Sequence, residues 1–150
     1  MKHVLVLHGP NLNLLGEREP EIYGTMTLAQ LNKKIRAEAR PLGLSVRIFQ
    51  KNGEGSLIDL LHRHRRWMAA VLINPGAYTH YSYALHDALI AVQCPAVEVH
   101  LSDIRRREKW RRKSVIAPAC AGRFMGKGVD SYIEGLRWLQ KKLAKSKTKT

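Results

Sequence analysis

Short apolar runs recur along the whole chain, and most are separated by amphipathic stretches; this alternation most constrains the fold. Five runs are apolar enough to be strands, at residues 3–8, 44–50, 69–73, 96–101 and 115–117. The intervening stretches and the last segment carry apolar residues at three- and four-residue steps, which is typical of helices with one buried face. Strands joined by helices pair in parallel through right-handed crossovers. The sequence therefore predicts an α/β fold: a flavodoxin-like, doubly wound five-stranded parallel sheet, order 2-1-3-4-5, with helices on both faces.

The length of 150 residues fits a single domain with a substantial core. We expect that domain to cover residues 1–143 and the basic residues 144–150 to form a disordered tail. No apolar run approaches the roughly 20 residues that a membrane span needs, and His8-Gly9-Pro10 interrupts the first one. We therefore expect a cytoplasmic protein without a signal peptide, with Cys94 and Cys120 reduced.

The charge balance is strongly basic, with a formal net charge of +14. Such a balance favours an anionic partner, which leaves nucleic acid, an acidic membrane surface or an acidic small molecule open. The basic residues cluster at 63–66, 105–113 and 141–149, and the first and third clusters also fit solvated helix faces. Only Trp67 and Trp110 accompany these clusters, so the aromatic interleaving typical of nucleic-acid binding is weak.

Polar segments follow the first, third and fourth predicted strands. In a doubly wound sheet the ligand site lies outside the carboxyl ends of the strands, where the strand order reverses. The segments expected there are residues 9–24, 74–80 and 98–103. Residues 9–24 are long for a strand-to-helix connection and are not of low complexity, which indicates an active-site loop.

Phosphate-binding and metal-binding patterns are weak in this sequence. The loop after the first strand has neither Gly-x-Gly-x-x-Gly nor Gly-Lys-[Ser/Thr], and Gly126-Lys-Gly128 precedes the last helix instead. The seven histidines are scattered without the spacing of a zinc site. We therefore expect no cofactor and no metal, and acid–base chemistry by the side chains themselves.

Two pairs of residues suit that chemistry. A cation within about 4–6 Å of a tyrosine favours its phenolate, and Arg18 precedes Tyr23 on the same loop. His100 ends the fourth strand, and Glu98, two residues earlier, lies on the same side of that strand. A carboxylate there can orient the imidazole as a general acid.

Three further residues suit substrate binding or charge stabilisation. Asn11 and Asn74 can donate hydrogen bonds to a developing oxyanion or to hydroxyls, and Arg111 can hold a carboxylate. Simple structural roles compete with these: Tyr23 and Asn74 can belong to turns, Asn11 can cap the loop, His100 can be an ordinary strand-end residue, and Glu98 with Arg111 can be a surface ion pair. The functional reading is favoured because all these residues fall on one predicted rim of the sheet.

Several motifs in order resemble the type II 3-dehydroquinate dehydratases over about residues 3–140. The three longest are Gly9-Pro-Asn-Leu-Asn-Leu-Leu-Gly16, Ile73-Asn-Pro-Gly-Ala-Tyr-Thr-His80 and Glu98-Val-His-Leu-Ser102. The others are Arg18-Glu-Pro with Tyr23-Gly24, Phe49-Gln50 with Asn52, Arg107-Glu108 with Arg111, and Gly126-x-Gly128 with Tyr132. The resemblance departs from the usual pattern at Lys51, His86, Asp103 and Ser131.

The resemblance implies a cofactor-free lyase that removes water from 3-dehydroquinate by anti elimination, giving 3-dehydroshikimate through an enolate. It implies that Tyr23 takes the C2 proton, that Arg18 favours its phenolate, and that Asn11 with a bound water stabilises the enolate. His100, oriented by Glu98, would protonate the departing C1 hydroxyl. Such an enzyme serves the shikimate pathway or quinate breakdown.

The resemblance also implies how the substrate is held and how the chains assemble. The implied binding residues of the chain itself are Asn74, His80, Leu101, Ser102 and Arg111. Asp87 matches an aspartate supplied by a neighbouring subunit, and the predicted helix around it is apolar nearly all round, which suggests an interface. The implied assembly is a homododecamer, a tetramer of trimers, in which residues 16–24 act as a lid.

Overall fold

Five parallel strands form one sheet in the computed structural model, which describes residues 1–146. The strand order is β2-β1-β3-β4-β5, and each neighbouring pair is parallel. This confirms the predicted flavodoxin-like arrangement. The strands are β1 (Lys2–His8), β2 (Leu44–Gln50), β3 (Ala70–Asn74), β4 (Ala96–His100) and β5 (Gly122–Met125).

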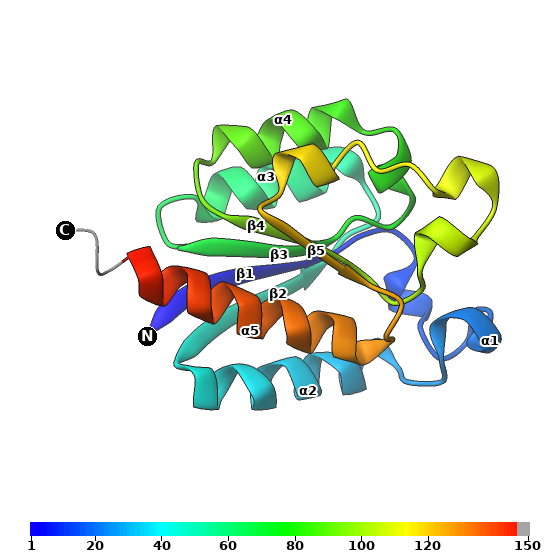
Figure 1. The fold of residues 1–150 in the computed structure, drawn as a ribbon, viewed down its shortest axis with the longest axis horizontal. Coiled ribbons are helices and arrows are strands. Elements are labelled where there is room, and N and C mark those ends of the chain that lie inside the picture. The colour runs from blue at the N-terminus through cyan, green and yellow to red at the C-terminus, as the bar shows by residue number, and fades with distance from the viewer. Residues whose placement is uncertain (147–150) are drawn as a thin grey trace.

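Helices cover both faces of the sheet, as Figure 1 shows. Two lie on one face, α2 (Leu28–Ala39) and α5 (Val129–Ser146), and two on the other, α3 (Glu54–His64) and α4 (Tyr83–Ala91). Side chains along β1 alternate between the two cores. Val4 and Val6 pack toward α2 and α5, whereas Leu5 and Leu7 pack toward α3 and α4. Burial on both faces explains why this strand is a continuous apolar run.

The predicted position of the fifth strand was wrong. Residues 115–117 are not a strand: Val115 and Ile116 are buried in the core beneath α3 and α4, and a short 3-10 helix, Ala117–Ala119, follows. The strand β5 instead lies further along the chain, at Gly122–Met125, and it pairs Val97 with Gly122. Apolar character marks burial, not hydrogen bonding in a sheet, and an edge strand such as β5 needs little apolar character.

The start of α2 follows from local sequence, since threonine favours the N-cap position. Thr27 begins α2 with a reciprocal pair of bonds: its hydroxyl accepts from the Gln30 backbone N–H at 3.2 Å, and the Gln30 side chain accepts from the Thr27 N–H at 2.9 Å. The last helix, α5, continues to Ser146, so residues 144–146 of the expected tail 144–150 are its last turn. Residues 147–150 of that expected tail lie outside the described residues. Within residues 1–146, no helix is both long and apolar enough to cross a membrane.

Replacing Thr27 by alanine removes one half of this capping box and leaves the first turn of α2 with an unpaired backbone N–H. We expect Thr27→Ala to lower the free energy of unfolding by about 1 kcal/mol, measured by urea denaturation. Thr25→Ala, at an exposed position just before the cap, is the matched control and should change it by less than about 0.5 kcal/mol. Equal effects of the two substitutions would contradict the capping role.

Candidate active site

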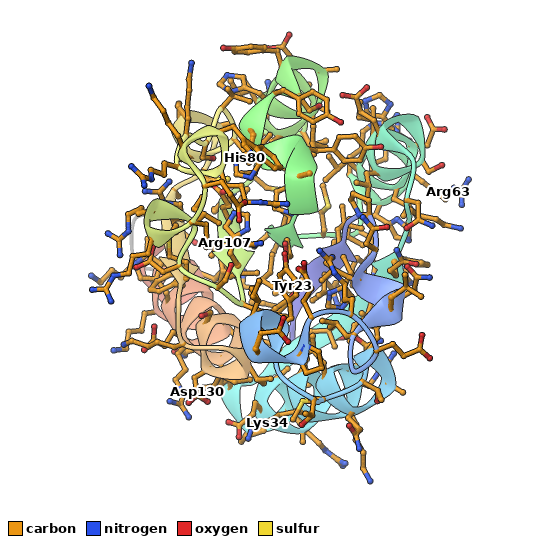
Figure 2. The ribbon with its side chains drawn as sticks, turned by 90° about the vertical axis from the view of Figure 1, so that its right-hand side faces the viewer. Tyr23, Lys34, Arg63, His80, Arg107 and Asp130 are labelled. Atoms are coloured by element: carbon orange, nitrogen blue, oxygen red, sulfur yellow. The ribbon has the colours of Figure 1, made fainter. Side chains whose placement is uncertain are left out.

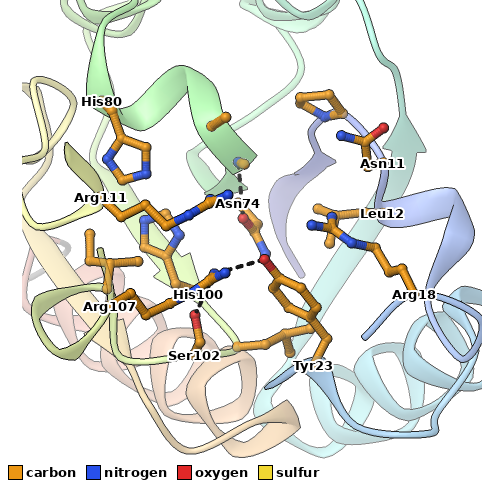
Figure 3. A pocket seen from close by; sticks show the side chains of 15 residues that line it. Asn11, Leu12, Arg18, Tyr23, Asn74, His80, His100, Ser102, Arg107 and Arg111 are labelled. Atoms are coloured by element: carbon orange, nitrogen blue, oxygen red, sulfur yellow. Dashed lines mark hydrogen bonds between the residues drawn. The ribbon is translucent and has the colours of Figure 1, made fainter. Parts of the chain in front are cut away.

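A pocket opens where the carboxyl ends of β1, β3 and β4 meet, the place predicted from the strand order. Tyr23, His80 and Arg107 gather around this end of the molecule, while Arg63 and Lys34 lie at its periphery (Figure 2). Figure 3 shows the pocket from close by. The residues that line it are Pro10, Asn11, Leu12, Arg18, Tyr23, Asn74, Gly76, Ala77, His80, His100, Leu101, Ser102, Ile104, Arg107 and Arg111.

The floor of the pocket depends on a close approach of the loops after β1 and β3. The Gly9 N–H donates to the Asn74 carbonyl at 2.8 Å. A Cβ atom at Gly9 would lie 2.6 Å from the Pro75 oxygen, and Gly76 has a φ of +60° with Pro10 against it. Only glycine accommodates both conditions without strain. The two loops are therefore held together at a fixed distance.

Asn11 lies on the fixed part of the first loop, in the left-handed conformation with a φ of 70°. Its backbone N–H donates to the side-chain oxygen of Asn52 at 3.0 Å. The Gln50 side chain donates to that same oxygen at 2.9 Å and to the Gly9 carbonyl at 3.0 Å. These contacts from the end of β2 anchor the backbone around Asn11, whose side chain borders the pocket (Figure 3).

Tyr23 ends the short helix α1 (Pro20–Tyr23), which Gly24 terminates with a φ of +82°. Arg18 stacks on the ring of Tyr23, with its guanidinium carbon 4.1 Å from the ring centroid. Arg107 approaches from the other side of the pocket and donates from Nη1 to the Tyr23 hydroxyl oxygen at 2.7 Å. The cation at the hydroxyl is thus Arg107, while Arg18 lies at the ring face.

Arg107 was not among the site residues predicted from the sequence. It lies within a run of basic residues between 105 and 113, and periodicity does not say which of them faces inward. In the structure Arg105 and Arg106 pair with Asp103 at the surface, whereas Arg107 turns into the pocket and also donates to the Ser102 hydroxyl at 3.4 Å. The available signal was its place in the Arg107-Glu108 motif.

His100 and Glu98 form a buried pair at the end of β4. The His100 Nε2 lies 2.5 Å from Glu98 Oε2. Glu98 also accepts from the Thr79 hydroxyl at 2.6 Å and from the Ser114 hydroxyl at 2.8 Å. Burial alone would raise the pKa of Glu98, but the hydrogen bonds from His100, Thr79 and Ser114 outweigh it and lower that pKa below its ordinary value.

His100 and Glu98 have different positions relative to the pocket. His100 lines the pocket, while Glu98 lies behind it and does not. Because Nε2 is bound to the carboxylate, any proton delivered to a ligand would leave from Nδ1. Thr79 and Ser114 were also not predicted from the sequence, since a hydroxyl in a turn carries no sign of which distant carboxylate it will meet.

The remaining predicted binding residues of this chain lie on the same rim. The His80 Nδ1 donates to the Lys113 carbonyl at 2.8 Å, and burial lowers the pKa of His80. Arg111 stacks on Trp110 at 4.0 Å and pairs with Glu108. That pairing differs from the surface ion pair with Glu98 that the sequence left open. Leu101 and Ser102 complete the lining.

Asp87 belongs to α4, which contributes no residue to the lining of this pocket. It is exposed on α4 and does not line the pocket. The same helix exposes other side chains, with Ile90 55% accessible and Tyr83 at its start 61% accessible. The supply of Asp87 by a neighbouring subunit therefore stays a prediction. Within residues 1–146, no group of three or more His, Cys, Asp or Glu side chains could hold a metal ion.

Comparison with known proteins shows the family of this chain. The family model described as "Dehydroquinase class II" matches residues 2–140. The chain belongs to the class II dehydroquinases. Among curated relatives of this dehydroquinase chain, the 3-dehydroquinate dehydratase of Carboxydothermus hydrogenoformans is 59% identical over 133 residues, covering 89% of this chain and 86% of the relative. That of Caldicellulosiruptor bescii is 55% identical over 137 residues, covering 91% and 94%.

Solved structures agree with the sequence relatives. The crystal structure of a type II dehydroquinase from Butyrivibrio crossotus matches with a TM-score of 0.90 at 40% identity, covering 92% of this chain and 97% of that one. A type II dehydroquinase from Propionibacterium acnes matches with the same TM-score and identity, covering 94% and 97%. The fold of this chain and its sequence motifs therefore indicate the same family.

The hydrogen bond from the Thr79 hydroxyl to the Glu98 carboxylate can be tested through stability. Thr79→Val keeps the shape of the side chain but removes the hydroxyl, so we expect it to lower the free energy of unfolding by about 1–3 kcal/mol at pH 7. Because the pKa of Glu98 is lowered in the fold, the stabilising effect of its carboxylate is present above the ordinary value of 4.5 and is lost as the pH falls. The deficit of Thr79→Val should shrink accordingly.

Urea denaturation of the unsubstituted protein and of Thr79→Val, at several pH values between 7 and 3, measures the difference in their free energies of unfolding. Thr79→Ser, which keeps a hydroxyl at the same position, is the control and should retain the pH dependence of the unsubstituted protein. A deficit that stays constant into acid would show that Thr79 does not act on the carboxylate.

Proposed function

We propose that the chain is a cofactor-free hydro-lyase that converts 3-dehydroquinate to 3-dehydroshikimate. The observation that carries this proposal is a tyrosine whose hydroxyl receives an arginine hydrogen bond, 2.7 Å long, in the same pocket as a carboxylate-bound histidine. Such a pocket offers a base, an acid and cationic groups for an anionic substrate. The curated relatives, named 3-dehydroquinate dehydratases, support the choice of substrate. We propose a cytoplasmic enzyme of the shikimate pathway or of quinate breakdown.

In the first step Tyr23, as its phenolate, removes the C2 proton next to the substrate ketone. Its negative charge is favoured by Arg107 at the hydroxyl and by Arg18 on the ring face. The electron pair left on carbon moves into the carbonyl and forms an enolate. Asn11, held by Asn52 at the pocket edge, stabilises that oxygen through a bound water.

In the second step the enolate collapses and expels the C1 hydroxyl as water. His100 supplies the proton, and Glu98 behind it stabilises the charged imidazolium before transfer. Base and acid come from separate elements, the lid helix α1 and strand β4, so they can act on opposite faces of the ring. This arrangement supports anti elimination.

The rest of the rim is suited to hold the substrate. Arg111 and Ser102 offer donors to the carboxylate, and Leu101 also lines the pocket. Asn74 and His80 offer polar contacts to the ring hydroxyls. The pocket places Arg18, Arg107 and Arg111 around the space for a small anion. We propose such an anion, and not nucleic acid or a membrane surface, as the partner of this pocket.

The decisive experiment is ultraviolet absorbance after 3-dehydroquinate is added, because the product is a conjugated enone and the substrate is not. We expect a rise that survives EDTA and survives borohydride with substrate. Loss under borohydride would indicate a lysine Schiff base, and loss under EDTA a metal. No rise with the folded protein would overturn the proposal.

Tyr23→Phe removes the base but keeps the ring against Arg18. We expect kcat to fall by at least about 100-fold while substrate still binds, measured by turnover and by calorimetric titration. Tyr81→Phe, at an exposed tyrosine before α4 and outside the pocket lining, is the matched control and should keep turnover. Retained turnover in Tyr23→Phe would assign the base elsewhere.

Arg107 and Arg18 can be separated by the pH dependence of the rate. Removing a cation disfavours the phenolate, so the acidic limb of the kcat/KM profile should move to higher pH in both Arg107→Met and Arg18→Met. The shift should be larger for Arg107→Met, because Arg107 donates directly to the oxygen. Arg106→Met, whose side chain is 88% accessible, should leave the profile unchanged. An equal shift in all three would indicate a general effect of net charge.

We also propose that a neighbouring subunit supplies Asp87, in a homododecamer built as a tetramer of trimers. The exposed apolar side chains on α4 around Asp87 support a protein interface there. The substrate-binding role of Asp87 would then depend on assembly and not on the fold of one chain.

Mixing two inactive variants tests this assignment. Tyr23→Phe lacks the base and Asp87→Ala lacks the shared residue, so each alone should be nearly inactive. After dissociation and joint reassembly, sites with Tyr23 from one chain and Asp87 from the other should regain part of the activity. Absence of recovery in mixed oligomers of confirmed composition would place Asp87 outside the neighbour's site.

A further inference from the structure

Three consecutive arginines, Arg105, Arg106 and Arg107, follow β4, and the third of them reaches the pocket. In Figure 3 the Arg107 side chain points toward the Tyr23 hydroxyl, to which it donates at 2.7 Å. The side chains of Arg105 and Arg106 are instead 63% and 88% accessible. Because the three side chains are chemically identical, a group outside them must determine which one turns inward.

The carboxylate of Asp103 contacts both of the outward arginines. Its Oδ1 accepts from the Arg105 Nε at 3.0 Å and its Oδ2 from the Arg105 Nη2 at 3.1 Å, while Oδ2 also lies 3.7 Å from the Arg106 Nε. The bond from Arg105 lowers the pKa of the Asp103 carboxyl, so this group is ionised at neutral pH. Exposed ion pairs contribute little to the free energy of folding, but they favour one orientation of a flexible side chain over another.

The same carboxylate also fixes the backbone that leads to Arg107. Its Oδ1 accepts from the Arg105 backbone N–H at 3.0 Å and so caps the 3-10 turn that begins at Ile104. Within this turn the Asp103 carbonyl accepts from the Arg106 N–H at 3.1 Å, and the Ile104 carbonyl accepts from the Arg107 N–H at 3.4 Å. Ile104 is buried and lines the pocket, so the turn is anchored beside the site.

Asp103 itself is held against the loop between β5 and α5. In that loop Gly126 has a φ of +84°, and a Cβ atom there would lie 3.0 Å from the Asp103 Cβ. The Gly128 N–H of the same loop donates to the Leu101 carbonyl at 3.0 Å. The segment after β4 therefore rests on the segment after β5, and the Asp103 side chain starts from a fixed position.

We propose that Asp103 is a positioning residue that directs Arg107, and not its two neighbours in the sequence, to the Tyr23 hydroxyl. Its carboxylate holds the two preceding guanidiniums at the surface, and its cap sets the direction in which the chain leaves the turn. Asp103 does not line the pocket, so it acts through Arg107. This inference rests on the proposed function, since it depends on Arg107 favouring the Tyr23 phenolate.

A simple effect of charge predicts the opposite result. Asp103 and Tyr23 both line a groove beside the pocket, and removing a negative charge favours a nearby phenolate. By charge alone, loss of the carboxylate would move the acidic limb of the kcat/KM profile to lower pH. Misplacement of Arg107 would move that limb to higher pH. The other charged side chains lining the groove, which are the same in both cases, are Arg106, Arg107 and Glu108.

The test is the pH dependence of kcat/KM with 3-dehydroquinate for Asp103→Ala. We expect the acidic limb to move up by about 0.5–1 pH unit, which lowers kcat/KM on that limb by about three- to tenfold. In an Arg107→Met background the same substitution should cause no upward shift. Asp103→Asn keeps an acceptor for the Arg105 N–H but loses the charge, so it should cause a smaller upward shift.

Asp130→Ala is the control for net charge. Asp130 is an exposed acidic residue that lies away from Tyr23 in Figure 2 and does not line the pocket. Its substitution should leave the kcat/KM profile unchanged.

The outcomes separate this inference from the proposed function. A downward shift or no shift in Asp103→Ala, or an upward shift of the same size in the Arg107→Met background, would overturn the positioning role. An unsubstituted protein that does not turn over 3-dehydroquinate would instead overturn the proposed function.

The ionisation of Tyr23 can also be followed without turnover. Solid-state NMR of protein labelled with ¹³Cζ-tyrosine distinguishes phenol from phenolate, and the Tyr23 signal is assigned by its absence in Tyr23→Phe. We expect the midpoint of this ionisation to move to higher pH in Asp103→Ala and to stay unchanged in Asp130→Ala. An unchanged or lower midpoint in Asp103→Ala would overturn the inference, whatever substrate the protein acts on.

Discussion

The close approach of the loops after β1 and β3 is the constraint on which the rest of the site depends. These neighbouring strands are joined by the Gly9 N–H to Asn74 carbonyl bond, and a side chain at Gly9 would collide with Pro75. From that junction one loop carries Asn11 and leads to α1, while the other presents Asn74 and His80. A doubly wound sheet places its ligand site here because the connections diverge to opposite faces and leave the strand ends open.

Electrostatic balance organises what faces that opening. The buried Glu98 carboxylate is held by His100, Thr79 and Ser114, and its pKa is lowered despite burial. On the other side, Arg107 and Arg18 place positive charge at the oxygen and the ring of Tyr23. The proposed acid, His100, is therefore paired with a carboxylate, and the proposed base, Tyr23, with two arginines from other segments. The same fold keeps His8 neutral by burial, where a charge would have no partner.

Much of the fold and part of the candidate site were predictable from the sequence, because local patterns indicate burial and turns well. The sheet order, the cap at Thr27 and the pairing of Glu98 with His100 follow from alternation, helix-start chemistry and the two-residue repeat of a strand. The fifth strand was misplaced because Val115 and Ile116 are apolar for packing, while β5 is an edge strand with few apolar demands. Arg107 was missed because, in a basic run, only three-dimensional placement distinguishes an inward arginine from Arg105 and Arg106.

The sequence by itself determined the class of fold, the rim on which chemistry is placed and, through its motifs, the family. These depend on composition and spacing along short segments, which the chain carries locally. Tertiary structure alone decided which cation contacts Tyr23, which hydroxyls hold Glu98, and that His8 contacts Tyr132. The His8 to Tyr132 contact joins residues 124 positions apart. No local pattern records such a contact, because it exists only once β1 and α5 have packed.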